Sequence, residues 1–494
     1  MDKETDYELL VADNIIGPFL IASNCSSIEV ALEKLIGIAK TPEGRSQLAS
    51  QNVISKLLEL CLSISYPMGC HILSLSLKLL RNLCAGEIRN QNAFLEENGV
   101  EVISTTITSI GFASDYDAEI VRMALQLLAN FVLAGGEHQR AVWCKFFPNG
   151  FLNLARVRSS ETCDPLCMVI YSCCEGDDKL LTDLCNEQGL PVIVEIIRTA
   201  CMADSATGSG FKLLLSTICI EGYHTESVFF KLDPDYAAGM IPADGHYVSE
   251  QAYTLRTLSD ALNCGIEILA VTSDFALCIL GILRSAGGGV DFTTRGKKGL
   301  PTGSILVNVL GYSLTILRDI CACDRRTGFK DDVVDVLVSS GLIELLLSFL
   351  RSLEPPAIIR AAMKQQQHRV NRQEKEETTM SSRQIITCCP YKGFRRDIVA
   401  ILGNCLYRRK YVQDEIRKRN GIVLLLQQCV PDEDNPFLRE WGIWAARNLF
   451  EGNTDNERVV ADLELQGTLN VPELALLGLR VEVDPRTHRA KLVH

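Results

Sequence analysis

The sequence predicts an all-α protein built from stacked helical repeats. Apolar residues recur with a helical period, as at Leu73, Leu77 and Leu80, and no convincing run alternates apolar and polar residues. In four segments an apolar helix carries Leu/Ile-x-Asn or a close variant and is followed by a polar turn and a second helix. The asparagines are Asn82, Asn130, Asn404 and Asn448; the first two are 48 residues apart and the last two 44. Such periods are typical of an armadillo/HEAT-type α-solenoid.

The second half of each repeat also recurs. The segments ENGVEVISTTI, EQGLPVIVEII, SSGLIELLLSFL and RNGIVLLLQQC each place a glycine before an apolar helix. We expect this glycine to supply the left-handed residue between two helices. Weaker copies also occur, and in YSLTILRDICACD the residue Asp319 takes the place of the asparagine. A solenoid tolerates this variation if its stacking face stays apolar.

Composition divides the chain into three parts. Residues 1–355 form a predicted N-terminal armadillo-like array, interrupted at 232–253 and 285–304 by segments rich in Pro, Gly and Asp. Residues 356–390 are rich in Gln, Arg, Lys and Glu, and we expect a flexible polar loop that begins as an exposed helix. Residues 391–494 form the predicted C-terminal armadillo module, with a capping tail in which LRVEVDP indicates an extended strand.

Charge and cysteine content narrow the class of protein. The net charge of −12 disfavours binding to a phosphate backbone, so we expect no nucleic-acid partner. None of the 20 cysteines forms a C-x-x-C pair, and most lie in Leu/Ile-rich stretches, where a thiol packs as a small apolar group. The N-terminus has no secretory pattern, so the expected location is cytoplasmic. The apolar stretch 264–283 contains Glu267 and Asp274, which argues for a buried helix pair and against membrane insertion.

Signals for catalysis are missing from the sequence. It contains no G-x-x-x-x-G-K-[ST], G-x-G-x-x-G, G-x-S-x-G or H-E-x-x-H pattern, and no pair among its seven histidines has metal-ligand spacing. We therefore expect a protein that is not an enzyme and that has no cofactor and no metal site.

The repeated asparagines are candidate binding residues. In an armadillo repeat the asparagine-bearing helix lines the concave surface, where an amide can bind the main chain of an extended partner. The alternative is that each amide caps a neighbouring helix or bonds within its own repeat. Both interpretations of Asn82, Asn130, Asn404 and Asn448 stay open at this point.

A second candidate is a patch near the last asparagine. Trp441, Trp444 and Asn448 share one helix face, and Arg447 lies beside them. Packing of the tryptophans against the preceding helix is the alternative. The segment 392–419 contains nine basic and three acidic residues, and Arg408 belongs to it. Its charge either binds an acidic partner or is neutralised by the acidic segment VPDEDNPF that follows. Within that segment, Asn435 is expected to cap the next helix.

The C-terminal segment resembles the ataxin-10 family. The resemblance covers residues 391–465 strongly and rests most on Gln413-Asp414, Gly421-Ile422, the DNPF run ending at Phe437, and the motifs Arg439-Glu440-Trp441 and Arg447-Asn448-Leu449. It implies an armadillo-like, non-enzymatic cytoplasmic protein linked to cytokinesis, cell survival and signalling, without a cofactor. We therefore expect a scaffold that binds other proteins along its concave surface, with self-association also possible; the alternative is an armadillo-type regulator or chaperone of a GTPase.

Overall fold

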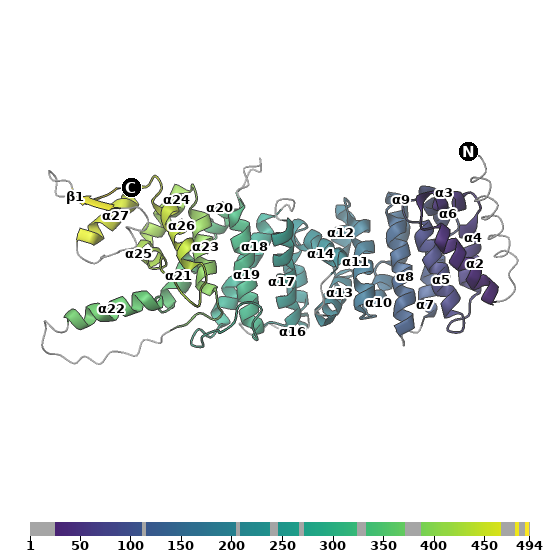
Figure 1. Cartoon of the computed structure of the whole chain (residues 1–494), viewed down its shortest axis with the longest axis horizontal. Coiled ribbons are helices and arrows are strands. Elements are labelled where there is room, and N and C mark those ends of the chain that lie inside the picture. The colour runs from purple at the N-terminus through teal and green to yellow at the C-terminus, as the bar shows by residue number, and fades with distance from the viewer. Residues whose placement is uncertain are drawn as a thin grey trace. The chain divides into compact units, whose positions relative to one another are not determined.

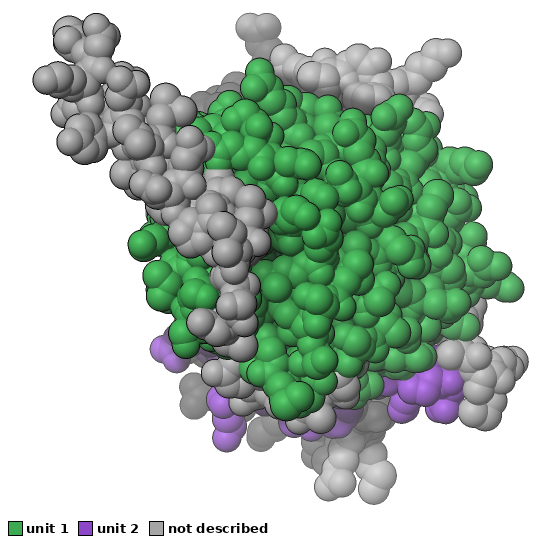
Figure 2. Space-filling model, turned by 90° about the vertical axis from the view of Figure 1, so that its right-hand side faces the viewer, with its two compact units in different colours: residues 1–231 green, residues 232–494 purple. Residues whose placement is uncertain are grey.

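A computed structural model describes residues 25–110, 115–203, 208–237, 246–265, 271–323, 332–370, 387–465, 480–483 and 490–493. The chain divides into two compact units, residues 1–231 and 232–494, which Figure 2 colours separately. Apart from one pair of short strands, the regular elements of the described residues are helices, which confirms the predicted all-α class. Residues on both sides of the segment 356–390 lie in unit 2, and the predicted division at that segment stays a prediction.

Unit 1 consists of short antiparallel helices in groups of three. Its helices are α2 (Cys25–Ile38), α3 (Pro42–Ala49), α4 (Val53–Ser63), α5 (Cys70–Leu83), α6 (Ile88–Glu96), α7 (Gly99–Ser109), α8 (Asp115–Val132), α9 (Gly136–Phe146), α10 (Asn149–Ala155), α11 (Ser160–Cys174), α12 (Asp178–Cys185), α13 (Leu190–Ala203), α14 (Ser209–Ser216) with its π-helical continuation η1 (Thr217–Glu221), and α15 (Thr225–Lys231). The first helix of each group packs against the first helix of the next, in the order α2, α5, α8, α11, α14.

Unit 2 repeats this arrangement. Its elements are α16 (Pro234–Ala237), α17 (Ser249–Gly265), α18 (Ser273–Gly289), α19 (Ile305–Ala322), α20 (Val333–Ser339), α21 (Leu342–Ser352), α22 (Ala357–Val370), α23 (Phe394–Leu406), α24 (Lys410–Lys418), α25 (Ile422–Leu426), α26 (Leu438–Phe450), α27 (Thr454–Leu465), β1 (Arg480–Val483) and β2 (Ala490–Val493). Here α17, α19, α23 and α26 pack in sequence against one another (Figure 1). We call these four, and the five first helices of unit 1, the spine helices.

The apolar period of the sequence forms the core between these helices. In α5, Leu73, Leu77 and Leu80 are all buried, whereas Lys78 is exposed on the opposite side. Each buried leucine contributes about 1.5–3 kcal/mol relative to exposure. Cysteines fill the same core, since 12 of the 19 described thiols are buried. The stacked repeats therefore form an armadillo-type α-solenoid, as predicted.

The glycine near the start of the third helix of a repeat has a different role from the predicted one at three of the four sites. Gly189 is not left-handed, and a Cβ there would lie 2.4 Å from the carbonyl oxygen of Leu184. At α7 and α25 the left-handed residue is the asparagine before the glycine, Asn98 (φ 55°) and Asn420 (φ 54°). The glycines are needed for space, because a Cβ on Gly99 would lie 2.6 Å from the Phe94 ring and one on Gly421 would lie 2.8 Å from Ile416. The prediction holds at Gly341, whose φ is 90°.

The stretch 264–283 is not one continuous helix. The helix α17 ends at Gly265 and α18 begins at Ser273. Among the described residues, α19 is the single helix long and apolar enough to cross a membrane, or the bent pair α20–α21 if it is counted as one span. In α19, 56% of the apolar window is buried, and this helix packs against α17, α18 and α23 as a core helix does.

Two interruptions of the repeat pattern pair with each other in unit 2. The first part of the segment 356–390 is the helix α22, and residues 371–386 lie outside the described residues. Thr387 pairs with Leu353 and accepts a hydrogen bond from the amide of Glu354 (2.9 Å). Gly296 then donates to the carbonyl of Cys389 (2.9 Å), so the loop after α18 is fixed to the residues that lead into α23.

The strand predicted in LRVEVDP is confirmed as β1. It pairs antiparallel with β2, with Arg480 opposite Val493 and Val483 opposite Ala490. The strand β2 lies beside α27, the last helix of the same chain. The strand β2 therefore packs on the terminal repeat of its own chain.

Amide and carboxylate side chains connect α24, α26 and α27. Gln413 donates to the carbonyl of Asn448 (2.7 Å), and Asn456 donates to the carbonyl of Leu449 (2.9 Å). Asp414 accepts from Asn453 (2.9 Å) and from Arg417 (2.8 Å). The hydrogen bond from Asn453, together with the nearby Arg417 guanidinium, lowers the pKa of Asp414 below its ordinary value of 3.8.

Acidification should therefore weaken this network. Because its folded-state pKa is depressed, ionised Asp414 adds stability above the unfolded-state pKa, and this is lost as pH falls below about 4. We expect Asp414→Asn to unfold at lower urea than wild type at pH 7, with the difference shrinking at pH 3.5. The exposed Asp455→Asn is the matched control. An Asp414 effect that stays constant between the two pH values would contradict this account.

Candidate protein-binding surface

Three of the four predicted asparagines connect neighbouring spine helices. Each donates its side-chain amide to a main-chain carbonyl of the preceding spine helix. The pairs are Asn130 to Arg81 (2.9 Å), Asn404 to Arg318 (3.4 Å) and Asn448 to Gly403 (2.9 Å). In every pair the acceptor is the residue just before the equivalent asparagine or, at Asp319, its substitute. The amides therefore bind a main chain, as one interpretation expected, but it belongs to the neighbouring repeat.

A glutamine completes the connection from the other side. Gln91 of α6 donates to the carbonyl of Asn130 (2.8 Å), as Gln413 of α24 does to that of Asn448. Both glutamines are buried and lie nine residues after the asparagine of their own repeat. Each of these junctions thus has two amide–carbonyl bonds running in opposite directions. Our sequence analysis named Gln413 only as part of the family resemblance and gave neither glutamine a structural role, although the spacing Asn-x8-Gln also occurs at Asn130 and Gln139.

The asparagine side chains differ in what they leave exposed. Asn448 is 1% exposed and lies in the interior, whereas Asn82, Asn130 and Asn404 are half-buried. The side-chain oxygen of Asn82 accepts a hydrogen bond from the Arg81 guanidinium (3.0 Å). The Asp319 carboxylate likewise accepts a hydrogen bond from Arg318. A continuous row of free amides is therefore not present on the described spine helices.

The exposed part of the surface is an aromatic stack with an arginine at each end. The rings of Tyr407, at the end of α23, and Trp444, in α26, stack with centroids 6.3 Å apart and an angle of 21°. The Arg408 guanidinium lies 5.0 Å from the Tyr407 centroid, and that of Arg447 lies 5.8 Å from the Trp444 centroid. Trp444 is 38% exposed and both arginines are exposed. We call these four residues the Arg–Trp patch.

The structure joins three of the predicted residues in this patch and separates two. Arg408, Trp444 and Arg447 belong to it, together with Tyr407, which our sequence analysis did not single out. Asn448 is buried beneath the surface, and Trp441, one turn earlier in α26, is half-buried. Tyr407 had a signal in the sequence, since it lies three residues after the asparagine of its repeat.

Arg408 has an unusual backbone conformation for its position. Four residues after the asparagine position, where the spine helix ends, the chain turns left-handed in several repeats. Glycine is found there at Gly86 (φ 70°), Gly176 (φ 77°) and Gly452 (φ 68°), whereas α23 has Arg408 (φ 55°). A non-glycine residue in this region costs roughly 1–2 kcal/mol. Local strain of this kind is concentrated at functional sites.

Most of the basic segment 392–419 is neutralised within the protein. Its five paired arginines are Arg395 with Asp432, Arg396 with Asp397, Arg409 with Asp332, Arg417 with Asp414, and Arg419 with Glu415. Only the Arg395 pair uses the acidic segment that our sequence analysis proposed as the neutralising partner. Among the described residues, no carboxylate forms an ion pair with Lys392, Arg408, Lys410, Lys418 or, in α26, Arg447.

The acidic turn 432–435 fixes the start of α23. The side chain of Asn435 accepts from the backbone amide of Arg395 (2.9 Å), in the first turn of α23. The prediction that it caps the following helix is therefore wrong, because α26 begins only at Leu438 and the turn folds back on a helix 40 residues earlier. The main-chain carbonyl of Asp434 also accepts a hydrogen bond from the backbone amide of Gly393 (2.8 Å).

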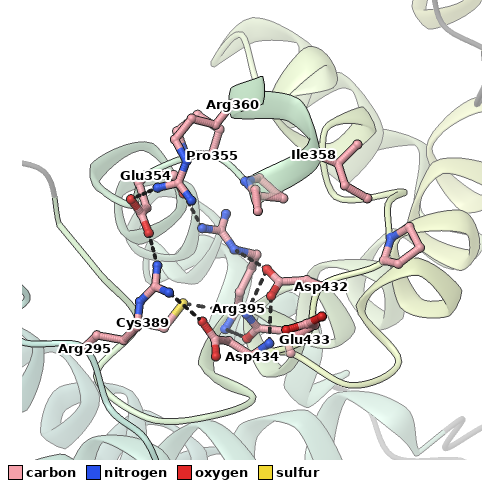
Figure 3. Close-up of a pocket in the computed structure, with 14 residues that line it drawn as sticks. Arg295, Glu354, Pro355, Ile358, Arg360, Cys389, Arg395, Asp432, Glu433 and Asp434 are labelled. Carbon is pink, nitrogen blue, oxygen red and sulfur yellow. Dashed lines mark hydrogen bonds and ion pairs between the residues drawn. The ribbon is translucent and has the colours of Figure 1, made fainter. Parts of the chain in front are cut away.

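A cavity of about 550 Å³ lies beside this turn (Figure 3). The Glu354 carboxylate lies between Arg295 and Arg360 and forms ion pairs with both, and Arg295 also pairs with Asp434 (3.2 Å). The buried Arg395 donates to Gln428 (3.1 Å) and to the carbonyl of Glu354. These charges hold one another, so the cavity is a structural junction between the α21–α22 corner and the acidic turn.

The chemistry of this cavity does not favour catalysis. Burial raises the pKa of the Cys389 thiol, which keeps it in its protonated, poorly nucleophilic form at neutral pH. Elsewhere among the described residues, Asp233, Asp235 and His246 place one ligand atom each within 4.8 Å of one another. Asp233 already accepts from the amide of Asp235 (2.9 Å), and acidic groups of this kind are common without an ion, so we assign no metal role.

Comparison with known proteins identifies the C-terminal module. Residues 394–492 match a family model described as "Spinocerebellar ataxia type 10 protein domain". Ataxin-10 from Xenopus tropicalis is 23% identical over 420 residues, which cover 84% of this chain and 79% of that protein. Residues 394–492 therefore form an ataxin-10 family domain. The Arg–Trp patch and the acidic turn both lie within its ataxin-10 domain.

The sequence similarity is concentrated in that domain. An ataxin-10 homolog from Dictyostelium discoideum is 42% identical over 92 residues, which cover 19% of this chain and 15% of the homolog. Human ataxin-10 is 38% identical over 90 residues, or 18% of this chain and 19% of the human protein. These stronger matches span less than a fifth of either relative.

Similar solved structures include designed repeat proteins. An engineered protein aligns with 94% of this chain and 96% of its own length at 14% identity, with a TM-score of 0.41. A designed armadillo repeat protein in complex with the peptide (KR)4 aligns with 61% of this chain and 98% of its own length at 13% identity, with a TM-score of 0.35.

Removal of a buried asparagine amide should destabilise the ataxin-10 domain. In Asn448→Ala the carbonyl of Gly403 loses a buried donor, which we expect to cost about 1–3 kcal/mol. Urea unfolding followed by circular dichroism, with hydrogen exchange at α23 and α26, measures this loss. Arg447→Ala, one residue away and exposed, is the control and should change stability by less than about 0.5 kcal/mol. Equal effects of the two variants would count against the inter-repeat role.

Replacement of the left-handed arginine should have the opposite effect on stability. In Arg408→Gly the backbone strain is relieved while a weak exposed contact with Tyr407 is lost, so stability should be unchanged or raised by up to about 1 kcal/mol. The urea midpoint of the full chain measures this change. A loss of more than about 1 kcal/mol would mean that Arg408 supports the fold.

Proposed function

We propose that this protein is a non-enzymatic interaction scaffold that binds partner proteins at the Arg–Trp patch of its ataxin-10 domain. The observation that carries the proposal is an exposed Trp444 stacked on Tyr407 and flanked by two arginines without an ion-pair partner among the described residues. Trp, Tyr and Arg are the residue types most enriched among those that dominate binding energy. The strained Arg408 backbone gives independent support, because three other repeats have glycine at the equivalent position, namely Gly86, Gly176 and Gly452.

The proposal also covers the cellular role. The similarity to ataxin-10 proteins supports the proposal of a cytoplasmic protein linked to cytokinesis, cell survival and signalling. The armadillo-type solenoid supports binding of proteins, since such folds work through extended surfaces built by stacked repeats. The buried asparagine Asn448 narrows the proposed surface: partners meet the patch side chains, whereas the amides hold the repeats together.

Site-directed photo-crosslinking tests the proposal. A photoreactive phenylalanine analogue at Tyr407 should crosslink specific cytosolic proteins, and one at the exposed Leu133 of unit 1 is the matched control. Truncation in Trp444→Ala should weaken binding of the crosslinked partner by about 30-fold, as expected for a central hot-spot residue. The Trp444→Ala variant must keep the wild-type circular dichroism spectrum and melting temperature.

Two results would overturn the scaffold proposal. One is a set of crosslinked proteins that is the same at positions 407 and 133. The other is a partner whose affinity for the folded Trp444→Ala variant equals its affinity for wild type.

A further inference from the structure

The charge pattern around the Arg–Trp patch indicates the class of partner. The chain has a net charge of −12, and five of the six arginines in the segment 392–419 form an ion pair with a carboxylate of the protein. Arg408 is the exception, and it lies with Arg447 of α26 at the two ends of one aromatic stack. The exposed Lys410, two residues after Arg408, adds a third positive charge without an ion pair among the described residues. The patch is thus a local positive surface on an acidic protein.

The stacked geometry keeps the arginines available. A guanidinium held over an aromatic ring uses its face for that contact, and the N–H donors at its edge remain free for a carboxylate. The contact also restricts the long side chain before binding, which reduces the entropy lost when a partner is bound. Arg408 is held further by its left-handed backbone (φ 55°).

The dimensions of the patch fit an extended peptide. Successive centres along Arg408, Tyr407, Trp444 and Arg447 are 5.0, 6.3 and 5.8 Å apart. These separations together set an upper limit on the distance between the two guanidinium groups. An extended chain advances about 3.3 Å per residue, so a segment of at most about five or six residues spans the patch. Carboxylates near its two ends would meet the arginines, and an apolar side chain between them would meet the exposed face of Trp444.

The inter-repeat bonds disfavour binding of a partner by the asparagine amides, because Asn448 is buried and the amides of Asn404 and Asn448 each already use one of their two donors. The amide nitrogens of Asn404 and Asn448 already donate to main-chain carbonyls of the preceding spine helix. A partner on α23 and α26 therefore meets charged and aromatic groups, and its recognition depends on its own side chains.

We propose that the Arg–Trp patch binds an acidic, extended segment of a partner protein, with its carboxylates paired to Arg408 and Arg447 and an apolar side chain against Trp444. This inference rests on the proposed scaffold function and specifies the partner of the same surface. The need for an apolar side chain against Trp444 distinguishes the patch from a general basic surface, which would bind acidic residues whether or not an apolar residue lies between them.

Fluorescence polarisation with defined peptides tests the inference on the full chain. The probe is a labelled peptide, Gly-Asp-Asp-Leu-Asp-Asp-Gly, compared with its Asn counterpart and with its Lys counterpart. We expect the acidic peptide alone to bind, with an affinity that falls as salt rises. Replacing Leu by Gly in the peptide should weaken binding at least 5-fold.

Matched charge variants locate the interaction. The double variant Arg408→Gln/Arg447→Gln should lose at least 10-fold in affinity, whereas Lys392→Gln/Lys418→Gln, which removes the same charge from exposed sites outside the patch, should bind within 2-fold of wild type. Circular dichroism and melting temperature confirm that all variants are folded.

The outcomes separate this inference from the scaffold proposal. Equal binding of the acidic and Asn peptides, no binding up to 1 mM, or equal losses in the two double variants would overturn the acidic-segment inference. Binding of a 20-nucleotide RNA in preference to the acidic peptide would also overturn it. If a photoreactive residue at position 407 still crosslinks a partner that Trp444→Ala releases, the scaffold proposal stands without the preference for acidic segments. If no such partner is crosslinked, the scaffold proposal and the acidic-segment inference both fail.

Discussion

The paired amide–carbonyl bonds between neighbouring repeats are the interaction on which the rest of the structure depends. At two junctions an asparagine donates back to the preceding spine helix, and a glutamine of that preceding repeat donates forward to the carbonyl of the same asparagine. Apolar packing between spine helices is not directional and would allow one helix to slide along the next. Buried hydrogen bonds have a defined geometry, so they fix the register of the stack. The surface on α23 and α26 has its shape because this register is fixed.

The fold could be predicted from the sequence because its signals are local. The helical period of α5 and the return of asparagine after 44 to 48 residues need no knowledge of distant contacts. The destinations of the amides could not be predicted in the same way. The carbonyl that Asn448 reaches is 45 residues earlier, and Asn435 caps a helix 40 residues before it. A capping residue and its helix are adjacent in most sequences, and here the acidic turn folds back on α23 instead.

The binding surface was partly visible from the sequence for the same reason. Trp444 and Arg447 share one helix, so their proximity follows from helical spacing. Tyr407 lies in another repeat, and only the stacking of α23 against α26 brings its ring to Trp444. The charge of the segment 392–419 also needed the structure, since Arg409 reaches Asp332, 77 residues earlier, and Arg395 reaches Asp432. What remains after this neutralisation is a small positive surface that a count of charges along the chain does not reveal.

The pairing of Thr387 with Leu353 has a consequence for how unit 2 tolerates change. Because the chain leaves the stack at Glu354 and returns beside the same point, the residues between form a closed excursion from the solenoid. The free energy of closing such a loop depends only on the logarithm of its length, so each doubling costs roughly 0.6 kcal/mol. Insertions and deletions within this excursion therefore change the stability of the repeats on either side very little. The repeat stack can therefore keep its geometry when this excursion changes in length, as long as Arg360 of α22 still pairs with Glu354.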